Sequence, residues 1–195
     1  MVPAFVPLEG RFVRLEPFTP DLRQAVGAMM DCDAELWSIM SASGQGEHFA
    51  QWWATALGEQ AKDERMPYAV RRLSDGAVVG TMSYLTLRPA HRGVEIGHSF
   101  IHPDVRGGPV NPESKYLLLA HAFAAGAVRV EFVIDARNQR SQAAVAKLGA
   151  VREGVLRNHK ITWTGYVRDS AIYSITDLEW PAVRDGLEAR LAGFP

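Results

Sequence analysis

The chain has 195 residues, a length that favours one domain and is ample for a buried core. Apolar residues make up 47% of it, and 21 basic against 22 acidic side chains give a net charge of −1, which argues against a protein that mainly coats nucleic acid or an anionic membrane. Cys32 is the only cysteine, which excludes an internal disulfide and a thiolate zinc cage. Since Pro3 and Pro7 interrupt an N-terminus without a basic segment, we expect no signal peptide and a cytoplasmic protein.

The first half of the chain predicts an antiparallel meander preceded and interrupted by helices. Thr19 and Pro20 are typical of a helix start, with Thr19 as the N-cap. Asp75-Gly76 between two apolar runs predicts a hairpin with a type I′ turn, in which both central residues have positive φ. The expected elements are strands at 11–16, 68–73, 77–84 and 94–101 and helices at 19–30 and 47–62.

The second half alternates strands with helices. Asn111 as N-cap, Pro112 at the first position and Gly126 past the end predict a helix over 112–125. The remaining elements are an alternating strand at 128–134, a helix at 139–148, a hairpin of strands at 151–163 and 168–175 that turns at Thr164-Gly165, and a helix at 179–191. We therefore expect a single α/β (α+β) domain over residues 1–195.

Several motifs are missing or unconvincing. No Gly-x-Gly-x-x-Gly follows a strand and no P-loop motif occurs, which excludes the common dinucleotide and nucleoside-triphosphate cradles. His98 and His102 are four residues apart on an expected strand, and this spacing separates them by about 13 Å. We therefore expect no metal site.

The most informative block runs from Glu95 to Lys115, where a strand leads through a glycine-rich turn into a helix. Such a turn directs free backbone N–H groups and the positive end of a helix to one point, which suits a phosphate. Arg106 adds a cation beside it. The alternative is that Gly107-Gly108-Pro109 only ends the strand.

A second block favours the phosphate interpretation. It comprises Asp135-Ala-Arg-Asn138-Gln-Arg-Ser141 and Lys147-Leu-Gly-Ala-Val-Arg-Glu-Gly-Val-Leu-Arg157. Together, the two blocks resemble the GNAT superfamily of acetyl-CoA-dependent N-acetyltransferases, in particular its RimJ/RimL-like branch of ribosomal-protein N-terminal acetyltransferases, and the resemblance extends from Leu8 to Trp180. It implies a mixed, mostly antiparallel seven-stranded sheet splayed between strands 4 and 5, with about four helices and a C-terminal helix. It also implies transfer of acetyl from acetyl-CoA to a primary amine by direct attack.

The resemblance also implies which residues bind coenzyme A. The family's pyrophosphate turn falls on residues 106–111, where Pro109 and Asn111 replace the usual small residues, while four backbone N–H groups remain and binding is expected to be retained. Asn138 matches the family asparagine that hydrogen-bonds the cofactor arm, and it is also a candidate N-cap. The free edge of the expected strand would pair with the pantetheine amides. The implied cofactor-binding residues are Ser99, Phe100, Ile101, Arg106, Gly107, Gly108, Val110, Asn111, Asn138 and Ser141.

The implied catalytic residues are Glu95, Ser141 and Tyr173. Glu95 lies eleven residues before Arg106, a spacing similar to that of the general base in histone-acetylating members; the alternative is a strand carboxylate paired with Arg92 or Arg129. Deprotonating an amine at pH 7 costs about 1 kcal/mol for an α-amine and 4–5 for a lysine, which favours a low-pKa amine.

The leaving thiolate needs a proton donor. Many members have a tyrosine seven residues after the asparagine, where this chain has Val145. Ser141 and Tyr173 are the candidate donors in its place, although Tyr173 is equally typical of a core tyrosine.

Two other interpretations stay open. The altered turn and the missing tyrosine are compatible with a weakly active or inactive module of the same fold that binds acyl-CoA or a peptide. The aromatic residues Trp37, Phe49, Trp52 and Trp53 are compatible with a protein-docking surface, although core packing is favoured.

The expected partners are an amine acceptor, either a peptide N-terminus or a small molecule, and a second copy in a homodimer; no nucleic acid and no membrane are expected.

Overall fold

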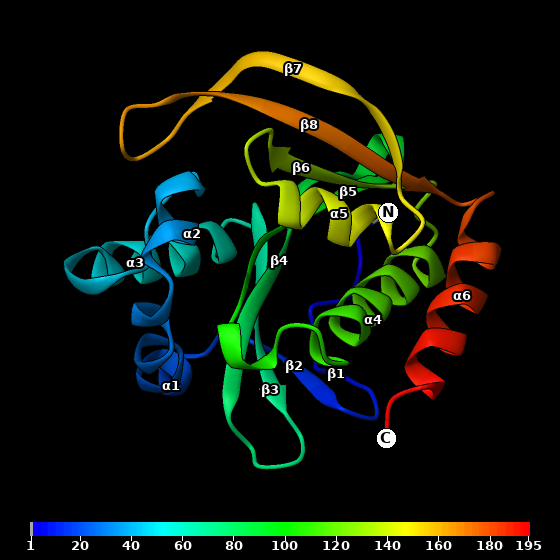
Figure 1. Cartoon of the computed structure of the whole chain (residues 1–195), viewed down its shortest axis with the longest axis horizontal. Helices are drawn as coiled ribbons and strands as arrows, with labels where there is room; N and C mark the ends of the chain where they lie inside the picture. Colours follow the sequence, from blue (N-terminus) through cyan, green and yellow to red (C-terminus); the bar gives the residue numbers. More distant parts are fainter. Residues whose placement is uncertain (1) are drawn as a thin grey trace.

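Eight strands form one twisted sheet in the computed structural model, which describes residues 2–195 (Figure 1). Its strand order is β1-β2-β3-β4-β5-β6-β8-β7, and each neighbouring pair is antiparallel except β5 and β6, which run parallel. The strands are β1 (Leu8–Glu9), β2 (Val13–Pro17), β3 (Arg65–Arg72), β4 (Val78–Arg88), β5 (Gly93–Ile101), β6 (Arg129–Asp135), β7 (Val151–Ile161) and β8 (Val167–Thr176).

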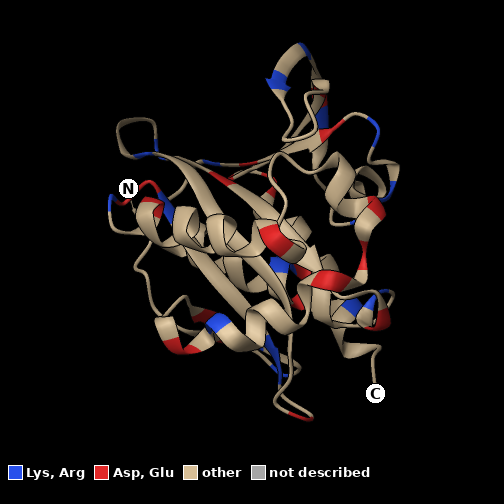
Figure 2. Ribbon diagram, turned by 90° about the vertical axis from the view of Figure 1, so that its left-hand side faces the viewer, with Lys and Arg blue, Asp and Glu red and all other residues tan. Residues whose placement is uncertain are grey.

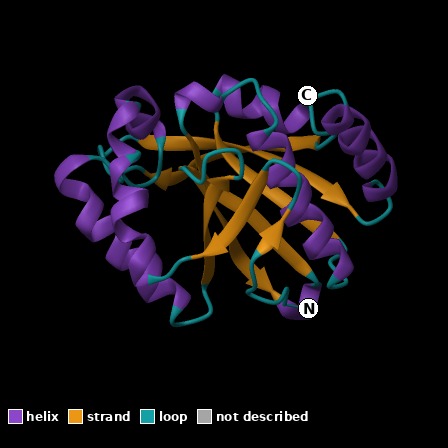
Figure 3. Ribbon diagram, turned by 90° about the horizontal axis from the view of Figure 1, so that it is seen from below, coloured by secondary structure: helices purple, strands orange, loops and turns teal. Residues whose placement is uncertain are grey.

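The helices pack in two groups around this sheet (Figure 3), and the labels of Figure 1 identify these groups as α1 to α3 and α4 to α6. Their bounds are α1 (Arg23–Ala28), α2 (Ala34–Ile39), α3 (Phe49–Gln60), α4 (Val110–Ala124), α5 (Gln139–Ala146) and α6 (Trp180–Ala192). Successive side chains of β3 point to opposite faces of the sheet, and a separate hydrophobic core lies on each face. Tyr68 and Val70 belong to the larger core, while Ala69 between them belongs to the smaller one. Within residues 2–195, no helix combines the length and apolar character needed to cross a bilayer.

The sheet opens between its two parallel strands. β5 and β6 are paired at Gly93–Glu95 and Arg129–Glu131 and then diverge. On its other side, β5 stays paired with β4 as far as Ile101, which lies opposite Gly80. A register shift interrupts that pairing near His98, whose φ of +45° lies in the left-handed region. The β6-facing edge of the end of β5 is therefore left without a strand partner.

The sheet and its opening agree with the expected fold class, with one strand more than expected. The additional strand is β1, whose two residues pair with β2, so the opening between the expected strands 4 and 5 lies between β5 and β6. Helix α2 was not predicted, because its six residues are too few to show a clear hydrophobic period.

Three local predictions were wrong. Thr19 makes no side-chain capping bond, and residues Pro20–Leu22 form a 3-10 turn before α1. In the hairpin between β3 and β4, Gly76 has φ +73° whereas Asp75 is not in the left-handed region, so the turn is not type I′. Helix α4 starts before Asn111, which lies in its first turn rather than at the N-cap.

The aromatic residues of the first helices form the smaller core. Trp37, Trp52 and Trp53 are each no more than 5% exposed, and Trp37 stacks on Phe100 with the ring centroids 4.9 Å apart. Phe49 is partly buried against the same cluster. The structure thus contradicts the docking-surface interpretation, because these rings already cover one another and the sheet.

Candidate active site

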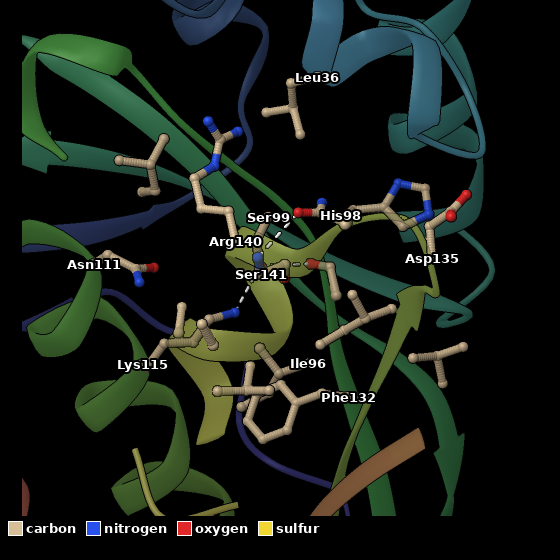
Figure 4. Close-up of a pocket in the computed structure, with 18 of the residues that line it drawn as sticks. Leu36, Ile96, His98, Ser99, Asn111, Lys115, Phe132, Asp135, Arg140 and Ser141 are labelled. Atoms are coloured by element: carbon tan, nitrogen blue, oxygen red, sulfur yellow. Dashed lines mark hydrogen bonds between the residues drawn. The ribbon is translucent and has the colours of Figure 1, made fainter. Parts of the chain in front are cut away.

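A cavity of about 410 Å³ occupies the opening between β5 and β6. The ends of these strands, the first turns of α4 and α5, and the segment that follows α2 line it. In the close-up of Figure 4, Asn111 and Lys115 reach into it from α4 and Ser141 from α5, while Ser99 and His98 reach into it from β5.

One end of the cavity presents the N-terminus of α4. Among residues 2–195, no hydrogen bond is made by the backbone N–H groups of Gly107, Gly108, Val110 and Asn111. Gly107 has φ +83°, a conformation that favours glycine and turns the chain so that these groups gather at the helix end. Free amides at the positive end of a 15-residue helix constitute an anion site.

The acidic residue of this first turn does not compete for those amides. The Glu113 carboxylate accepts hydrogen bonds from three backbone N–H groups on the other side of the helix: Arg11 at 2.8 Å, Phe12 at 2.6 Å and Val13 at 2.7 Å. Glu113 therefore anchors α4 against the start of β2 and leaves the anion site without a negative neighbour from its own turn.

The cavity wall is strongly cationic although the chain as a whole has a net charge of −1. Charges of both signs are interspersed over the ribbon in Figure 2, whereas seven basic and two acidic side chains line the cavity. The basic residues are Arg106, Lys115, Arg140, Lys147, Lys160, Arg168 and Arg190, and the acidic ones are Glu95 and Asp135. Such an excess within one concave site favours an anionic ligand.

Arg106 and Arg140 are oriented at the mouth of the cavity. Arg106 Nε donates to the Ile101 carbonyl at 3.1 Å, and its Nη2 forms an ion pair with Asp33. Asp33 also caps α2, where its carboxylate accepts from the Leu36 N–H at 2.9 Å, and it lies 3.7 Å from Arg140 Nη2. The capping residue of α2 thus holds both arginines beside the free amides.

The start of α5 faces the same space. The Asn138 side chain accepts a hydrogen bond from the Ser141 N–H at 3.0 Å, which is the N-cap that the sequence predicted. Both residues line the cavity, and the Ser141 hydroxyl makes no hydrogen bond within residues 2–195.

Lys115 lies deep between the diverging strands. Its side chain is buried, its Nζ donates to Ser99 Oγ at 2.6 Å, and the same nitrogen lies 5.5 Å from the centre of the Phe132 ring. Burial lowers the pKa of Lys115 to about 7.

Glu95 lies at the other end of the cavity, where the strands begin to part. It is 6% exposed, accepts a hydrogen bond from Thr86 Oγ1 at 2.9 Å, and has its pKa raised by burial. The alternative of a pairing with Arg92 or Arg129 is contradicted, because Arg92 donates to the Gly126 carbonyl and Arg129 pairs with carboxylates elsewhere. Glu95 is therefore a buried carboxylate that forms no ion pair with any basic side chain of residues 2–195.

Two other titratable groups at this end, His98 and Asp135, each have a pKa that keeps one protonation state at neutral pH. Burial, with the nearby cationic side chains Arg65, Lys160 and Arg168, lowers the pKa of His98 to about 3, so the ring is neutral. Burial opposes ionisation of Asp135, but hydrogen bonds and charge from Arg137 outweigh it and lower the pKa of Asp135.

Hydrogen bonds attach the β7–β8 turn and the start of β8 to α2 and to the segment that follows it. Trp163 Nε1 donates to the Trp37 carbonyl at 2.8 Å, and the Trp163 N–H donates to the Ser41 carbonyl at 3.2 Å. Arg168 Nη1 donates to Ser41 Oγ at 3.0 Å. Apolar side chains from α2 and the residues after it, including Leu36 and Met40, complete the roof.

The structure brings together most of the residues that the sequence singled out. Those that line the cavity are Glu95, Ser99, Ile101, Arg106, Gly107, Gly108, Asn111, Asn138 and Ser141. Phe100 points to the opposite face, as alternation along a strand requires, and the Val110 side chain is buried outside the cavity.

Tyr173 does not reach the cavity, which corrects its place among the candidate catalytic residues. It lies in the larger core, and its hydroxyl donates to Gln142 Oε1 at 3.3 Å. Tyr173 is therefore a core tyrosine, which is the alternative that the sequence left open.

Sequence reasoning missed several cavity residues. Lys115 could have been found, because it lies one helical turn after Asn111 and therefore on the same face of α4. Arg190 and Arg168 could not, since only the packing of α6 and β8 brings them to the cavity.

A family model described as an acetyltransferase (GNAT) domain matches residues 13–151, which is more than half of the chain. The chain belongs to the GNAT acetyltransferase family. One curated relative of this GNAT chain is the uncharacterized N-acetyltransferase YoaA of Bacillus subtilis (strain 168), 29% identical over 109 residues, which are 55% of the chain and 60% of YoaA. The chain thus matches less than two thirds of that relative's length.

Solved GNAT structures match the whole fold. One assigned to the acetyltransferases of T. thermophilus is 39% identical, with a TM-score of 0.85 and coverage of 95% of this chain and 96% of that one. A GCN5-related N-acetyltransferase from Brucella melitensis is 28% identical, with a TM-score of 0.90 and coverage of 98% and 87%. Mycobacterium smegmatis RimJ, at 23% identity, a TM-score of 0.77 and coverage of 94% and 92%, shares the fold.

Proposed function

We propose that this GNAT chain transfers acetyl from acetyl-CoA to a primary amine by direct attack of the amine nitrogen on the thioester. The observation that carries the proposal is the set of free amides at Gly107–Asn111, which open into a cationic cavity beside the unpaired edge of β5. The structure of M. smegmatis RimJ, which contains a CoA-disulfide, supports the choice of coenzyme A as the carrier.

The residues of the cavity suit each part of coenzyme A. The free amides and Arg106 would hold the pyrophosphate, as helix N-termini hold phosphates. The free edge at Ser99–Ile101 would pair with the amides of the pantetheine arm, as an added strand would. Pro109 removes one donor, but it lies at the N-cap of α4, where the remaining free amides are sufficient for a phosphate.

Glu95 would act as the general base through a water molecule. Its raised pKa makes it a better proton acceptor than an ordinary glutamate, and the burial that raises it also keeps bulk water away. The largest reduction of the activation barrier would come from holding the amine beside the thioester, since proximity supplies about 7–11 kcal/mol in favourable cases.

The charges of the cavity restrict the acceptor. Seven basic residues against two acidic ones oppose a polycation, so polyamines and multiply charged aminoglycosides are poor acceptors. The apolar roof and the Trp163 contact fit a compact group with one amine of low pKa, such as an α-amine. We place the reaction in the cytoplasm, in keeping with a chain of one cysteine.

A second candidate is a module that binds acyl-CoA without turnover. Val145 favours it, because that position holds no tyrosine to protonate the leaving thiolate.

Titration of acetyl-CoA followed by thiol release with a panel of amines separates the two candidates. An acetyltransferase releases one thiol for each amide formed, with monoamines of low pKa used best. Binding without thiol release from any amine would support the binding module, and the absence of binding would contradict both.

A further inference from the structure

Lys115 is a buried cation whose charge the fold does not need. Its side chain is 5% exposed, and none of the ion pairs among residues 2–195 includes it. An ammonium group removed from water without a counter-ion destabilises a folded protein, and an apolar chain of the same shape would pack there without that cost. A lysine at this place is therefore more readily explained by a chemical role than by packing.

The position of the ammonium group is well defined. It lies between the diverging strands, because it donates to Ser99 Oγ of β5 at 2.6 Å and lies 5.5 Å from the ring of Phe132 on β6. Figure 4 shows this hydrogen bond at the centre of the cavity, between the start of α5 and β5. One of the three N–H groups of Lys115 is used by Ser99, which itself lines the free edge of β5.

The tyrosine that many family members use to protonate the leaving thiolate has no equivalent in the cavity. Val145 stands where a tyrosine donor would be, and the Tyr173 hydroxyl is bonded to Gln142 behind α5. A serine hydroxyl alone, such as that of Ser141, is too weak an acid unless another group replaces its proton.

We propose that Lys115, acting through the Ser99 hydroxyl, is the proton source for the thiolate that leaves during acetyl transfer. This inference rests on the proposed function. As the new C–N bond forms and the C–S bond breaks, sulfur keeps the electron pair of the broken bond. The proton lost by the amine nitrogen passes through water to Glu95 and on to solvent.

The thiolate then takes the Ser99 Oγ proton, which Lys115 Nζ replaces in the same step. Lys115 recovers its proton from solvent before the next cycle, so the protons balance and nothing is oxidised or reduced. An ammonium group with a pKa of about 7 is a stronger acid than an alkyl thiol, whose pKa is about 8.5, whereas an ordinary lysine with a pKa of about 10.4 is weaker. The transfer from Lys115 is therefore downhill.

The test compares acetyl-CoA with its selenoester analogue in the wild type and in Lys115→Met. Selenols are stronger acids than thiols, so a selenolate leaves without being protonated. We expect Lys115→Met to lower kcat with acetyl-CoA about 10²-fold, with little change in KM, and to leave kcat with the selenoester near that of the wild type. The control is Lys62→Met, which removes an exposed lysine after α3 and should change neither donor.

The wild type provides a second test that does not depend on the variant. The ratio of kcat for the selenoester to kcat for acetyl-CoA should rise as the pH increases through the pKa of Lys115, because the titration of the acceptor amine cancels in the ratio. NMR titration of the lysine side chains in the unliganded protein should place the pKa of Lys115 near 7.

The outcomes separate this inference from the proposed function. Equal losses with both donors, a loss confined to KM, a flat ratio, or a Lys115 pKa near 10 would overturn the role of Lys115 while acetyl transfer stands. Failure of the wild type to release thiol would overturn both.

Discussion

The two ends of the cavity have opposite electrostatic designs. At the α4 end, free amides lie beside Arg106, which an ion pair with Asp33 orients, so an anion finds its partners already in place. At the β8 end, a buried Glu95 and a neutral His98 stand beside charges that are already paired. Under the proposed function, the α4 end would hold a phosphate, and the β8 end would keep an amine uncharged and accept its proton.

The largest effect is expected when the proton acceptor Glu95 is removed. Glu95→Gln keeps the size of the side chain and its neighbour Thr86 but removes the basic oxygen, so kcat/KM should fall about 10²–10⁴-fold with CoA affinity unchanged. Steady-state kinetics and calorimetry give the two values. Glu188→Gln, an exposed site on α6, is the matched control and should retain full activity.

The pH dependence of the wild type should agree with this role. Because burial raises the pKa of Glu95, the acid limb of kcat/KM should lie above the usual range of a glutamate, and activity should be lost as the pH falls through it. Full activity of Glu95→Gln would contradict the assignment, as would an acid limb that the two proteins share once the titration of the acceptor amine has been subtracted.

The next effect concerns the buried cation between the two ends. Lys115 has its pKa lowered to about 7 in the folded protein, so its charge destabilises the fold fully below pH 7 and not at all above about pH 10. Lys115→Met should therefore raise the free energy of unfolding at neutral pH by up to about 4 kcal/mol, and the gain should shrink as the pH rises toward 10. Urea unfolding at several pH values measures it, and a variant less stable than the wild type at pH 7 would contradict the account.

A smaller effect is expected at the phosphate end. Arg106→Gln removes a charge-assisted contact worth about 1.5–3 kcal/mol, so Kd for coenzyme A should rise about 10–100-fold and should depend less on salt. Arg184→Gln, an exposed arginine of α6 that pairs with Asp185, is the control. An unchanged Kd would show that the amides alone hold the phosphates.

The smallest effect tests the roof of the acceptor end. Trp163→Phe keeps an aromatic side chain, although a smaller one, and loses the hydrogen bond to the Trp37 carbonyl, which is worth about 1 kcal/mol. KM for the acceptor should rise a few-fold while Kd for coenzyme A stays the same. A change in coenzyme A binding instead would show that the roof belongs to the other end.

The two ends also differ in how far the sequence predicted them. The phosphate end is made by a short continuous stretch, from the end of β5 into α4, so its turn, its cation and its helix could be read from local pattern. The N-cap at Asn138 is local in the same way and was confirmed.

The acceptor end is made by packing of distant segments. Trp163 meets Trp37 across 126 positions of the chain, and Arg168 meets Ser41 across 127, and no local period encodes such contacts. The burial that raises the pKa of Glu95 likewise comes from packing, and α2 was too short for its hydrophobic pattern to be recognised.

The measurement that tests the central claim most directly is an amide NMR titration of the ¹⁵N-labelled protein with coenzyme A. The account predicts saturable shifts that are largest for the N–H groups of Gly107, Gly108, Val110 and Asn111, because these groups have no other partner within residues 2–195. Shifts confined to other parts of the chain, or none at millimolar coenzyme A, would contradict it.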